Sequence, residues 1–320
     1  MKKTFALLLA ALLLLSCVGS ALADVYKDAG FIKKIPMKPK YTEEVENKGT
    51  VEKITYTCHA YALEAINEGK EIMVEKDMYV YLPYGYSADQ DYNVIYLMHG
   101  GGEDEKYWLT MDRMGSGTLA MLDNINYKGD CEPTIIVTPT TNTGTILGEQ
   151  DEDLKTRGEG HAWHWKELRE DIIPLIETKY ATFAHGDVSP ENLKATREHR
   201  AFAGFSMGSI TACAVAMHDF DLFAYFGNFS GAKTEVADYV AALTSEEFKD
   251  LPFKFWYNGN GTVDQAHDEH NELCHGVLEA LPDRLEDGVN FCWIDFKGGA
   301  HAYGCWLPDL YNCMRVFFKQ

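Results

Sequence analysis

A serine flanked by two glycines is the feature of the sequence that most directly indicates chemistry. The segment GFSMG at residues 204–208 lies between a strand-like apolar run, Arg200–Phe205, and a run with helical spacing, Met207–His218. In that context G-x-S-x-G forms a sharp strand-to-helix turn that exposes the serine hydroxyl at the edge of a sheet. Ser206 is therefore the predicted nucleophile. The N–H of Met207, at a helix N-terminus, is a predicted donor to an oxyanion.

A serine hydroxyl needs a base, and chain order selects the histidine. In hydrolases that carry this turn, an acid and then a histidine follow the nucleophile. His301 lies in a loop with two glycines, residues 298–301, just after a predicted strand, Phe291–Phe296. The other histidines after Ser206 fall on predicted helices or at their starts: His218, His267, His270 and His275. His301 is the predicted general base.

The acid is expected after the preceding strand. A predicted strand at residues 253–257 is followed by a glycine-rich segment that ends at Asp264. Asp264 would fix the tautomer of His301 and stabilise the imidazolium. Asp268 is the nearest competitor but should lie one turn into the next helix. The alternative role for Asp264 is that of a helix N-cap.

A glycine-rich loop provides the second half of a predicted oxyanion hole. His99 and three glycines follow the apolar run Asn93–Met98. Successive glycines let backbone N–H groups approach a substrate oxygen closely. Gly101 is the first choice of donor and Gly102 the second, while His99 is expected to be structural.

No metal or organic cofactor is predicted. His267, His270 and Cys274 lie at i, i+3 and i+7 of one predicted helix, a pattern that could suggest zinc together with His275. The acidic residues beside them indicate a polar helix face instead.

Aromatic residues cluster near these motifs. Trp108 follows the glycine-rich loop, and Tyr303 and Trp306 follow His301. Trp163 and Trp165 follow a long irregular segment. Core packing is the ordinary role of such rings, although a sugar or a phenolic acyl group would stack on them. Trp306, Tyr303 and Trp108 are the predicted substrate contacts.

The elements around the motifs alternate between strand and helix. Predicted strands are residues 51–57, 77–82, 93–98, 134–138, 200–205, 224–229, 253–257 and 291–296, and predicted helices are residues 164–180, 207–218, 266–280 and 307–318. This alternation indicates an α/β fold with a mostly parallel central sheet and helices on both faces. Residues 140–160 fit no regular element and form either a surface loop or a flap over the site.

Composition narrows the class of protein. The chain has 320 residues, of which 46% are hydrophobic, enough to build a large core. The formal net charge is −20, so electrostatic repulsion disfavours a nucleic-acid partner.

The first 23 residues resemble a signal peptide. Lys2 and Lys3 precede an apolar run at residues 5–15 that is too short to span a bilayer, and Ala21-Leu22-Ala23 forms a cleavage site. The expected product is one domain at residues 24–320, secreted to the extracellular space or periplasm. The alternative is a lipoprotein acylated at Cys17, which would tether the protein to the cell surface.

Seven cysteines remain outside this leader. Their odd number leaves at least one free thiol in a monomer, and none forms a CxxC pair. No disulfide framework is predicted.

With these motifs in order, the chain resembles carbohydrate esterase family 1, the esterase D-like group, and most of all the feruloyl esterase domains of xylan-degrading bacteria. The matching segments are VYLPYGY at 80–86, YLMHGGG at 96–102, DIIP at 171–174, RAFAGFSMG at 200–208 and GGAH at 298–301, with GTVD at 261–264 and Trp306. The resemblance implies an α/β-hydrolase fold, a triad of Ser206, Asp264 and His301, and no cofactor. Ser209 departs from the family, which commonly has a glycine there.

The resemblance also implies the substrate class. Feruloylated xylan or its oligosaccharides are the expected partners, and acetylated xylan is the alternative. A siderophore esterase or a non-catalytic carbohydrate-binding protein are further alternatives.

Overall fold

The computed structural model describes residues 25–111, 113–149 and 153–319. The expected leader, residues 1–23, and the alternative lipid anchor at Cys17 lie outside this range, so they stay predictions, as does the division into leader and single domain. Within the described ranges no helix combines the length and the hydropathy needed to cross a membrane.

Within the described residues the sheet has nine strands, eight of them in the order β1-β2-β4-β3-β6-β7-β8-β9, with β5 paired to β2. The strands are β1 (Thr50–His59), β2 (Met73–Leu82), β3 (Asn93–Met98), β4 (Thr134–Thr138), β5 (Thr145–Ile146), β6 (Arg200–Phe205), β7 (Tyr225–Phe229), β8 (Phe255–Gly261) and β9 (Phe291–Phe296). From β4 to β9 along this order, neighbouring strands are parallel, whereas β1, β2 and β5 pair antiparallel. The predicted α/β-hydrolase fold with a mostly parallel sheet is confirmed.

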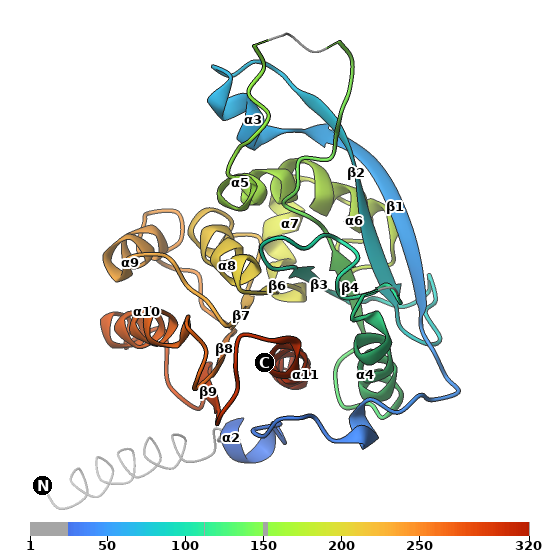
Figure 1. Cartoon of the computed structure of the whole chain (residues 1–320), viewed down its shortest axis with the longest axis vertical. Helices are drawn as coiled ribbons and strands as arrows, with labels where there is room; N and C mark the ends of the chain where they lie inside the picture. Colours follow the sequence, from blue (N-terminus) through green and yellow to red (C-terminus); the bar gives the residue numbers. More distant parts are fainter. Residues whose placement is uncertain (1–24, 112, 150–152, 320) are drawn as a thin grey trace, which may run out of the picture.

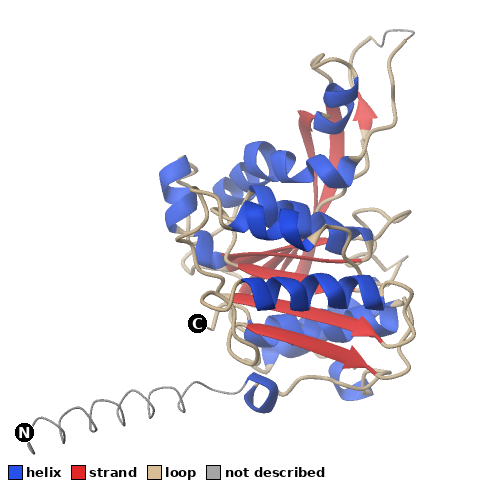
Figure 2. Cartoon of the chain, turned by 90° about the vertical axis from the view of Figure 1, so that its left-hand side faces the viewer, coloured by secondary structure: helices blue, strands red, loops and turns tan. Residues whose placement is uncertain are grey.

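Helices cover both faces of the sheet (Figures 1 and 2). They are α2 (Val25–Asp28), α3 (Tyr61–Ile66), α4 (Gly115–Tyr127), α5 (Gly160–Glu167), α6 (Ile173–Lys179), α7 (Pro190–Ala195), α8 (Met207–His218), α9 (Val236–Leu243), α10 (His267–Ala280) and α11 (Tyr303–Val316). A π-helical turn (Leu168–Ile172) joins α5 to α6, and 3-10 turns occupy Pro39–Tyr41 and Arg197–His199.

Each face of the sheet builds its own core, because side chains alternate along a strand. Val94, Tyr96 and Met98 of β3 join the cluster under α6 and α8–α10. Ile95 and Leu97 join the cluster under α4 and α11. A strand buried on both faces is mostly apolar, and the NVIYLM run, apolar after Asn93, fits this pattern.

Several predicted boundaries are wrong. The helix expected at 164–180 begins at Gly160 and is interrupted by the π-helical turn, which precedes Pro174, a residue with no N–H to donate. The strand expected at 253–257 runs instead from Phe255 to Gly261. The last helix begins at Tyr303 and contains Pro308 in its interior, although proline favours a first turn.

The segment 140–160 is more ordered than expected. Its residues Thr145 and Ile146 form β5, which pairs with Glu75 and Val74 of β2. Residues 150–152 lie outside the described range. In Figures 1 and 2 the ends of β1 and β2 nearest α3 extend beyond the helical layers.

Candidate active site

Ser206 occupies a strained turn at the carboxyl end of β6. Its φ of 54° and ψ of −117° lie in a region that residues with a side chain rarely adopt. The Ser206 N–H donates to the Phe229 carbonyl at 2.8 Å, which holds the turn against β7. Strain of this kind persists only where surrounding contacts enforce it, and it occurs most often at functional sites.

The two glycines of the GFSMG segment are required by close backbone approach. A Cβ on Gly204 would lie 2.7 Å from the carbonyl oxygen of Gly208. A Cβ on Gly208 would lie 2.6 Å from the His99 carbonyl oxygen. Both distances are below what a real Cβ tolerates, so the turn closes only with glycine at both positions.

The structure brings Ser206, His301 and Asp264 together as expected. His301 Nε2 lies 2.8 Å from Ser206 Oγ. His301 Nδ1 lies 2.9 Å from both carboxylate oxygens of Asp264. The Asp264 side chain is fully buried, whereas that of His301 is 22% exposed and so open to a ligand.

The loops that deliver acid and base are bound to each other. The Val263 N–H donates to the Gly299 carbonyl at 2.9 Å. A Cβ on Gly261 would come within 2.2 Å of that same carbonyl oxygen. Gly298, at a φ of 74°, turns the chain after β9 so that His301 points back towards β6. The glycines noted in the sequence therefore permit the two loops to meet.

Asp264 is held as a carboxylate by its hydrogen bonds. Burial alone would raise the pKa of Asp264, but the bonds from His301 and from the Ala266 N–H outweigh it and hold that pKa below its ordinary value. The Ala266 N–H lies 2.8 Å from Oδ1. Asp264 therefore binds the backbone just before α10, but it is not the helix N-cap, because that position is Ala266. Asp268 is fully exposed and pairs with His267, not with His301.

The predicted oxyanion donors lie side by side. Met207 is the first residue of α8, and a Cβ on Gly101 would lie 3.7 Å from the Met207 Cβ. Gly102, the second choice of donor, adopts a φ of 79°, a conformation that favours glycine. His99 is 3% exposed, as its expected structural role requires. Burial lowers the pKa of His99 to about 4.

The three aromatic residues take different positions. Trp306 stacks on Phe205 with ring centroids 4.0 Å apart and meets the His301 ring edge-on at 5.2 Å. Tyr303 is half-buried and binds Thr118. Trp108 does not fit its expected role, because its side chain is fully buried and its Nε1 donates to the Met98 carbonyl. Packing under the glycine-rich loop leaves no Trp108 surface for a ligand.

Ser209, which departs from the resembled family, fits into a polar cluster. Its hydroxyl donates to the Gly231 carbonyl, and Asn228 Nδ2 donates to that hydroxyl at 2.9 Å. The first turn of α8 therefore accommodates the side chain without disturbing Ser206.

The histidines of α10 are engaged elsewhere. His270 Nδ1 lies 2.9 Å from Asn260 Oδ1, and the Cys274 thiol donates to Asn258. Among the described residues, no group of three or more His, Cys, Asp or Glu side chains could hold a metal ion. Each of the seven cysteines in the described part of the chain is a free thiol.

Sequence reasoning missed Thr140 and Asn142, which bind the glycine-rich loop. Thr140 Oγ1 lies 2.8 Å from His99 Nε2, and Asn142 Nδ2 donates to the Glu103 carbonyl at 3.0 Å. The available signal was their position just after β4, at the sheet edge where Ser206 also lies.

Comparisons with known proteins place the chain among esterases. The model of the Esterase family, described as "Putative esterase", matches residues 70–274. Endo-1,4-beta-xylanase Y of Acetivibrio thermocellus is 29% identical over 305 residues, which is 92% of this chain and 25% of that protein. Endo-1,4-beta-xylanase/feruloyl esterase of Xylanibacter ruminicola is 28% identical over 250 residues, 75% of this chain and 29% of that protein. The chain thus spans only about a quarter of the length of these relatives.

A solved structure is similar over nearly its whole length. It is a mutant of the feruloyl esterase module from Clostridium thermocellum complexed with sinapinate, 28% identical, with a TM-score of 0.73 over 90% of this chain and 95% of that chain. The expected resemblance to feruloyl esterase domains is confirmed. Because the family model covers more than half of its length, this chain belongs to the Esterase family.

Proposed function

We propose that this chain is a secreted serine esterase that releases ferulic or related hydroxycinnamic acids from xylan. The observation that carries the mechanism is the hydrogen-bonded series from Ser206 Oγ through His301 to Asp264, with successive distances of 2.8 and 2.9 Å. Serine, base and orienting acid within hydrogen-bond reach are the requirements of nucleophilic ester hydrolysis.

In the proposed mechanism Ser206 Oγ attacks the ester carbonyl while His301 Nε2 takes its proton. Asp264 accepts the Nδ1–H of His301 and stabilises the imidazolium that forms. The N–H groups of Met207 and Gly101 donate to the oxyanion of the tetrahedral intermediate. His301 then protonates the leaving alcohol, and water hydrolyses the acyl-enzyme by the same route. No step requires a metal or an organic cofactor.

The substrate is proposed from the relatives and from the site. Two similar proteins carry feruloyl esterase in their names, and one was solved with sinapinate, a hydroxycinnamate. The aromatic ring of Trp306 lies beside His301, and a flat ring is a suitable neighbour for a phenolic acyl group. Secretion rests on the leader-like residues 1–23.

The test compares two substrates with one control variant. Purified protein is incubated with methyl ferulate and with acetylated xylan, alongside Ser206→Ala. We expect the parent to release ferulate. Ser206→Ala should release it at least about 10⁴-fold more slowly. Acetate without ferulate would move the substrate to acetyl-xylan. Hydrolysis that persists in Ser206→Ala would exclude Ser206 as the nucleophile.

A further inference from the structure

The glycine-rich loop at residues 99–105 is bound at three points by β4 and the residues that follow it. Thr140 binds the His99 ring, Asn142 binds the Glu103 carbonyl, and Thr138 Oγ1 donates to the Glu105 carbonyl at 2.9 Å. The loop contains Gly101, whose N–H is the proposed oxyanion donor. Its geometry therefore depends on the position of the segment 138–142.

That segment is anchored by a buried ion pair. Lys76 Nζ donates to the Thr140 carbonyl at 2.7 Å and to Glu167 Oε2 at 2.8 Å. The Lys76 and Glu167 side chains are only 4% and 9% exposed. Tyr56 donates its hydroxyl to Glu167 Oε1 at 2.7 Å, so both carboxylate oxygens are occupied. The pair joins β2 and α5 to the segment that follows β4.

The hydrogen bonds define the protonation of His99. Its Nδ1 lies 2.7 Å from the Gly100 carbonyl oxygen, which only accepts, so Nδ1 carries the proton. The low pKa of His99 keeps the ring neutral, because burial disfavours its charged form. Nε2 is then an acceptor, and the Thr140 hydroxyl is its donor. The Thr140 hydroxyl in turn accepts the Asn142 N–H at 3.1 Å.

Fixing the Gly100 carbonyl also fixes the Gly101 N–H. The two groups belong to one peptide plane, and in a trans peptide they point in opposite directions. A Gly100 carbonyl held on His99 therefore directs the Gly101 N–H in the opposite direction, across the C–N bond and within the same plane. A glycine-rich loop without this anchor has many accessible conformations, since glycine restricts φ and ψ so little.

We propose that Lys76 and Glu167 are positioning residues, which orient the Gly101 N–H towards the oxyanion through Thr140 and His99. This inference rests on the proposed function, because it assumes that an oxyanion forms next to Ser206. Lys76 and Glu167 touch no reacting atom in this scheme. Their effect is carried by the Thr140 carbonyl, the Thr140 hydroxyl and the His99 ring.

A second buried ion pair offers a matched control. Arg200 Nη1 lies 3.0 Å from Glu177 Oε1, and both side chains are 1% exposed. Arg200 begins β6, whereas Ser206 follows the other end of that strand. Removal of either pair tests the stability of the fold, but only the Lys76–Glu167 pair binds the segment next to the glycine-rich loop.

The first experiment changes Thr140 alone. Thr140→Val keeps the side-chain shape but removes the donor to His99, and Thr140→Ser restores the hydroxyl. We expect kcat on methyl ferulate to fall by about 10- to 100-fold in Thr140→Val with KM within about twofold, because an oxyanion donor acts in the transition state. Thr140→Ser should recover most of the loss. A change in KM alone, or no change in kcat, overturns the proposal.

The second experiment removes the whole ion pair, because a single unpaired buried charge could prevent folding. Lys76→Met/Glu167→Leu is compared with Arg200→Met/Glu177→Leu. We expect a fall in kcat of about tenfold or more only in the first double variant, at temperatures where circular dichroism shows both to be folded. Equal kcat in the two folded variants overturns the proposal.

Nitrogen-15 NMR of the imidazole separates this proposal from the proposed function. The parent should show neutral His99 with the proton on Nδ1, and its Nε2 resonance should move in Thr140→Val and in Lys76→Met/Glu167→Leu but not in the control pair. These signals do not require activity. A parent that hydrolyses no ester would refute the function, whereas a His99 proton on Nε2 would refute the positioning.

Discussion

Asp264 illustrates how much one carboxylate determines at the active site. Both of its oxygens lie 2.9 Å from His301 Nδ1, and the Ala266 N–H holds one of them in place. An ionised carboxylate only accepts hydrogen bonds, so it leaves the proton on Nδ1 and the lone pair on Nε2, which faces Ser206. The direction of proton transfer proposed above follows from this arrangement.

Asp264→Asn should reverse the tautomer preference of His301 with little change in side-chain shape. The amide can donate to Nδ1, which would place the imidazole proton on Nε2 and prevent His301 from accepting the Ser206 proton. We expect kcat on methyl ferulate to fall by about 10³- to 10⁴-fold. Asp268→Asn, at an exposed position nearby, should stay within about twofold of the parent. A loss below tenfold in Asp264→Asn would be evidence against its orienting role.

Functional residues can be predicted from the sequence where they lie near glycines in a distinctive pattern. They are missed where the surrounding sequence is of a common kind. Ser206, His301 and Asp264 each stand beside glycines that a tight turn requires. Trp108 was expected to contact substrate, yet it is buried, because a sequence does not tell which face of an aromatic ring is covered. Thr140 was missed since hydroxyl residues after a strand are common.

At the scale of elements, β6, the turn at Ser206 and α8 act as one unit. Gly208 lets the first turn of α8 approach the backbone of β3, where a Cβ would lie 2.6 Å from the His99 carbonyl and 2.8 Å from that of Met98. These carbonyls belong to the strand end that leads into the glycine-rich loop. The same contact therefore sets the nucleophile and the proposed oxyanion donors at a fixed separation.

Gly208→Ala should disturb both halves of the site, because the clash is with backbone that cannot rotate away. We expect kcat to fall by at least about 100-fold and the free energy of unfolding to fall by about 1–3 kcal/mol. Gly304→Ala is the matched control, since a Cβ there meets nothing within 4 Å. The control should keep its kcat, and its free energy of unfolding should rise by a few tenths of a kcal/mol. Equal activity in the two variants would contradict this account of the turn.

Element prediction succeeded for strands whose residues after the first are all apolar or glycine and failed for β8, whose second half alternates asparagine and glycine. The runs Asn93–Met98 and Arg200–Phe205 were predicted with their observed bounds, as expected for strands covered on both faces. β8 was cut short because Asn258 and Asn260 suggested a turn. In the structure both asparagines are buried and bonded to Cys274 and His270 of α10, contacts that no local pattern reveals.

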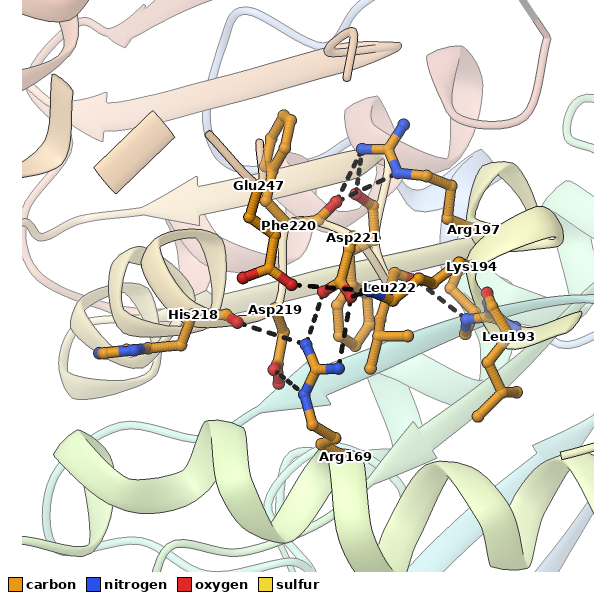
Figure 3. A network of polar contacts seen from close by, with 12 residues as sticks. Arg169, Leu193, Lys194, Arg197, His218, Asp219, Phe220, Asp221, Leu222 and Glu247 are labelled. Atoms are coloured by element: carbon orange, nitrogen blue, oxygen red, sulfur yellow. Dashed lines mark hydrogen bonds and ion pairs between the residues drawn. The ribbon is translucent and has the colours of Figure 1, made fainter. Parts of the chain in front are cut away.

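At the scale of the whole molecule, an ionic cluster joins distant segments at the end of α8 (Figure 3). Arg169 of the π-helical turn binds Asp219 at 2.8 Å and Asp221 at 2.5 Å, and Lys194 of α7 binds Asp221 at 2.9 Å. The two carboxylates differ in environment. Burial is the main reason why the pKa of Asp219 rises to about 8, and its Oδ2 has no partner. Burial also acts on Asp221, but bonds from Arg169 and Lys194 outweigh it and lower its pKa.

The opposite pKa shifts of Asp219 and Asp221 predict opposite effects of pH on the free energy of unfolding. An unfolded chain loses an aspartate proton near pH 4, whereas folded Asp219 keeps its proton to about pH 8. The unfolded state therefore binds fewer protons in between, so Asp219 makes the free energy of unfolding fall as pH rises. Denaturant unfolding at pH 5 and 7.5 should show this fall to be at least about 1 kcal/mol smaller in Asp219→Asn than in the parent. Asp221→Asn should instead be destabilised at neutral pH, because the Asp221 carboxylate stabilises the fold fully above about pH 4 and loses this effect as the pH falls further. Identical pH dependence in the parent and Asp219→Asn would show that Asp219 is ionised in the folded protein.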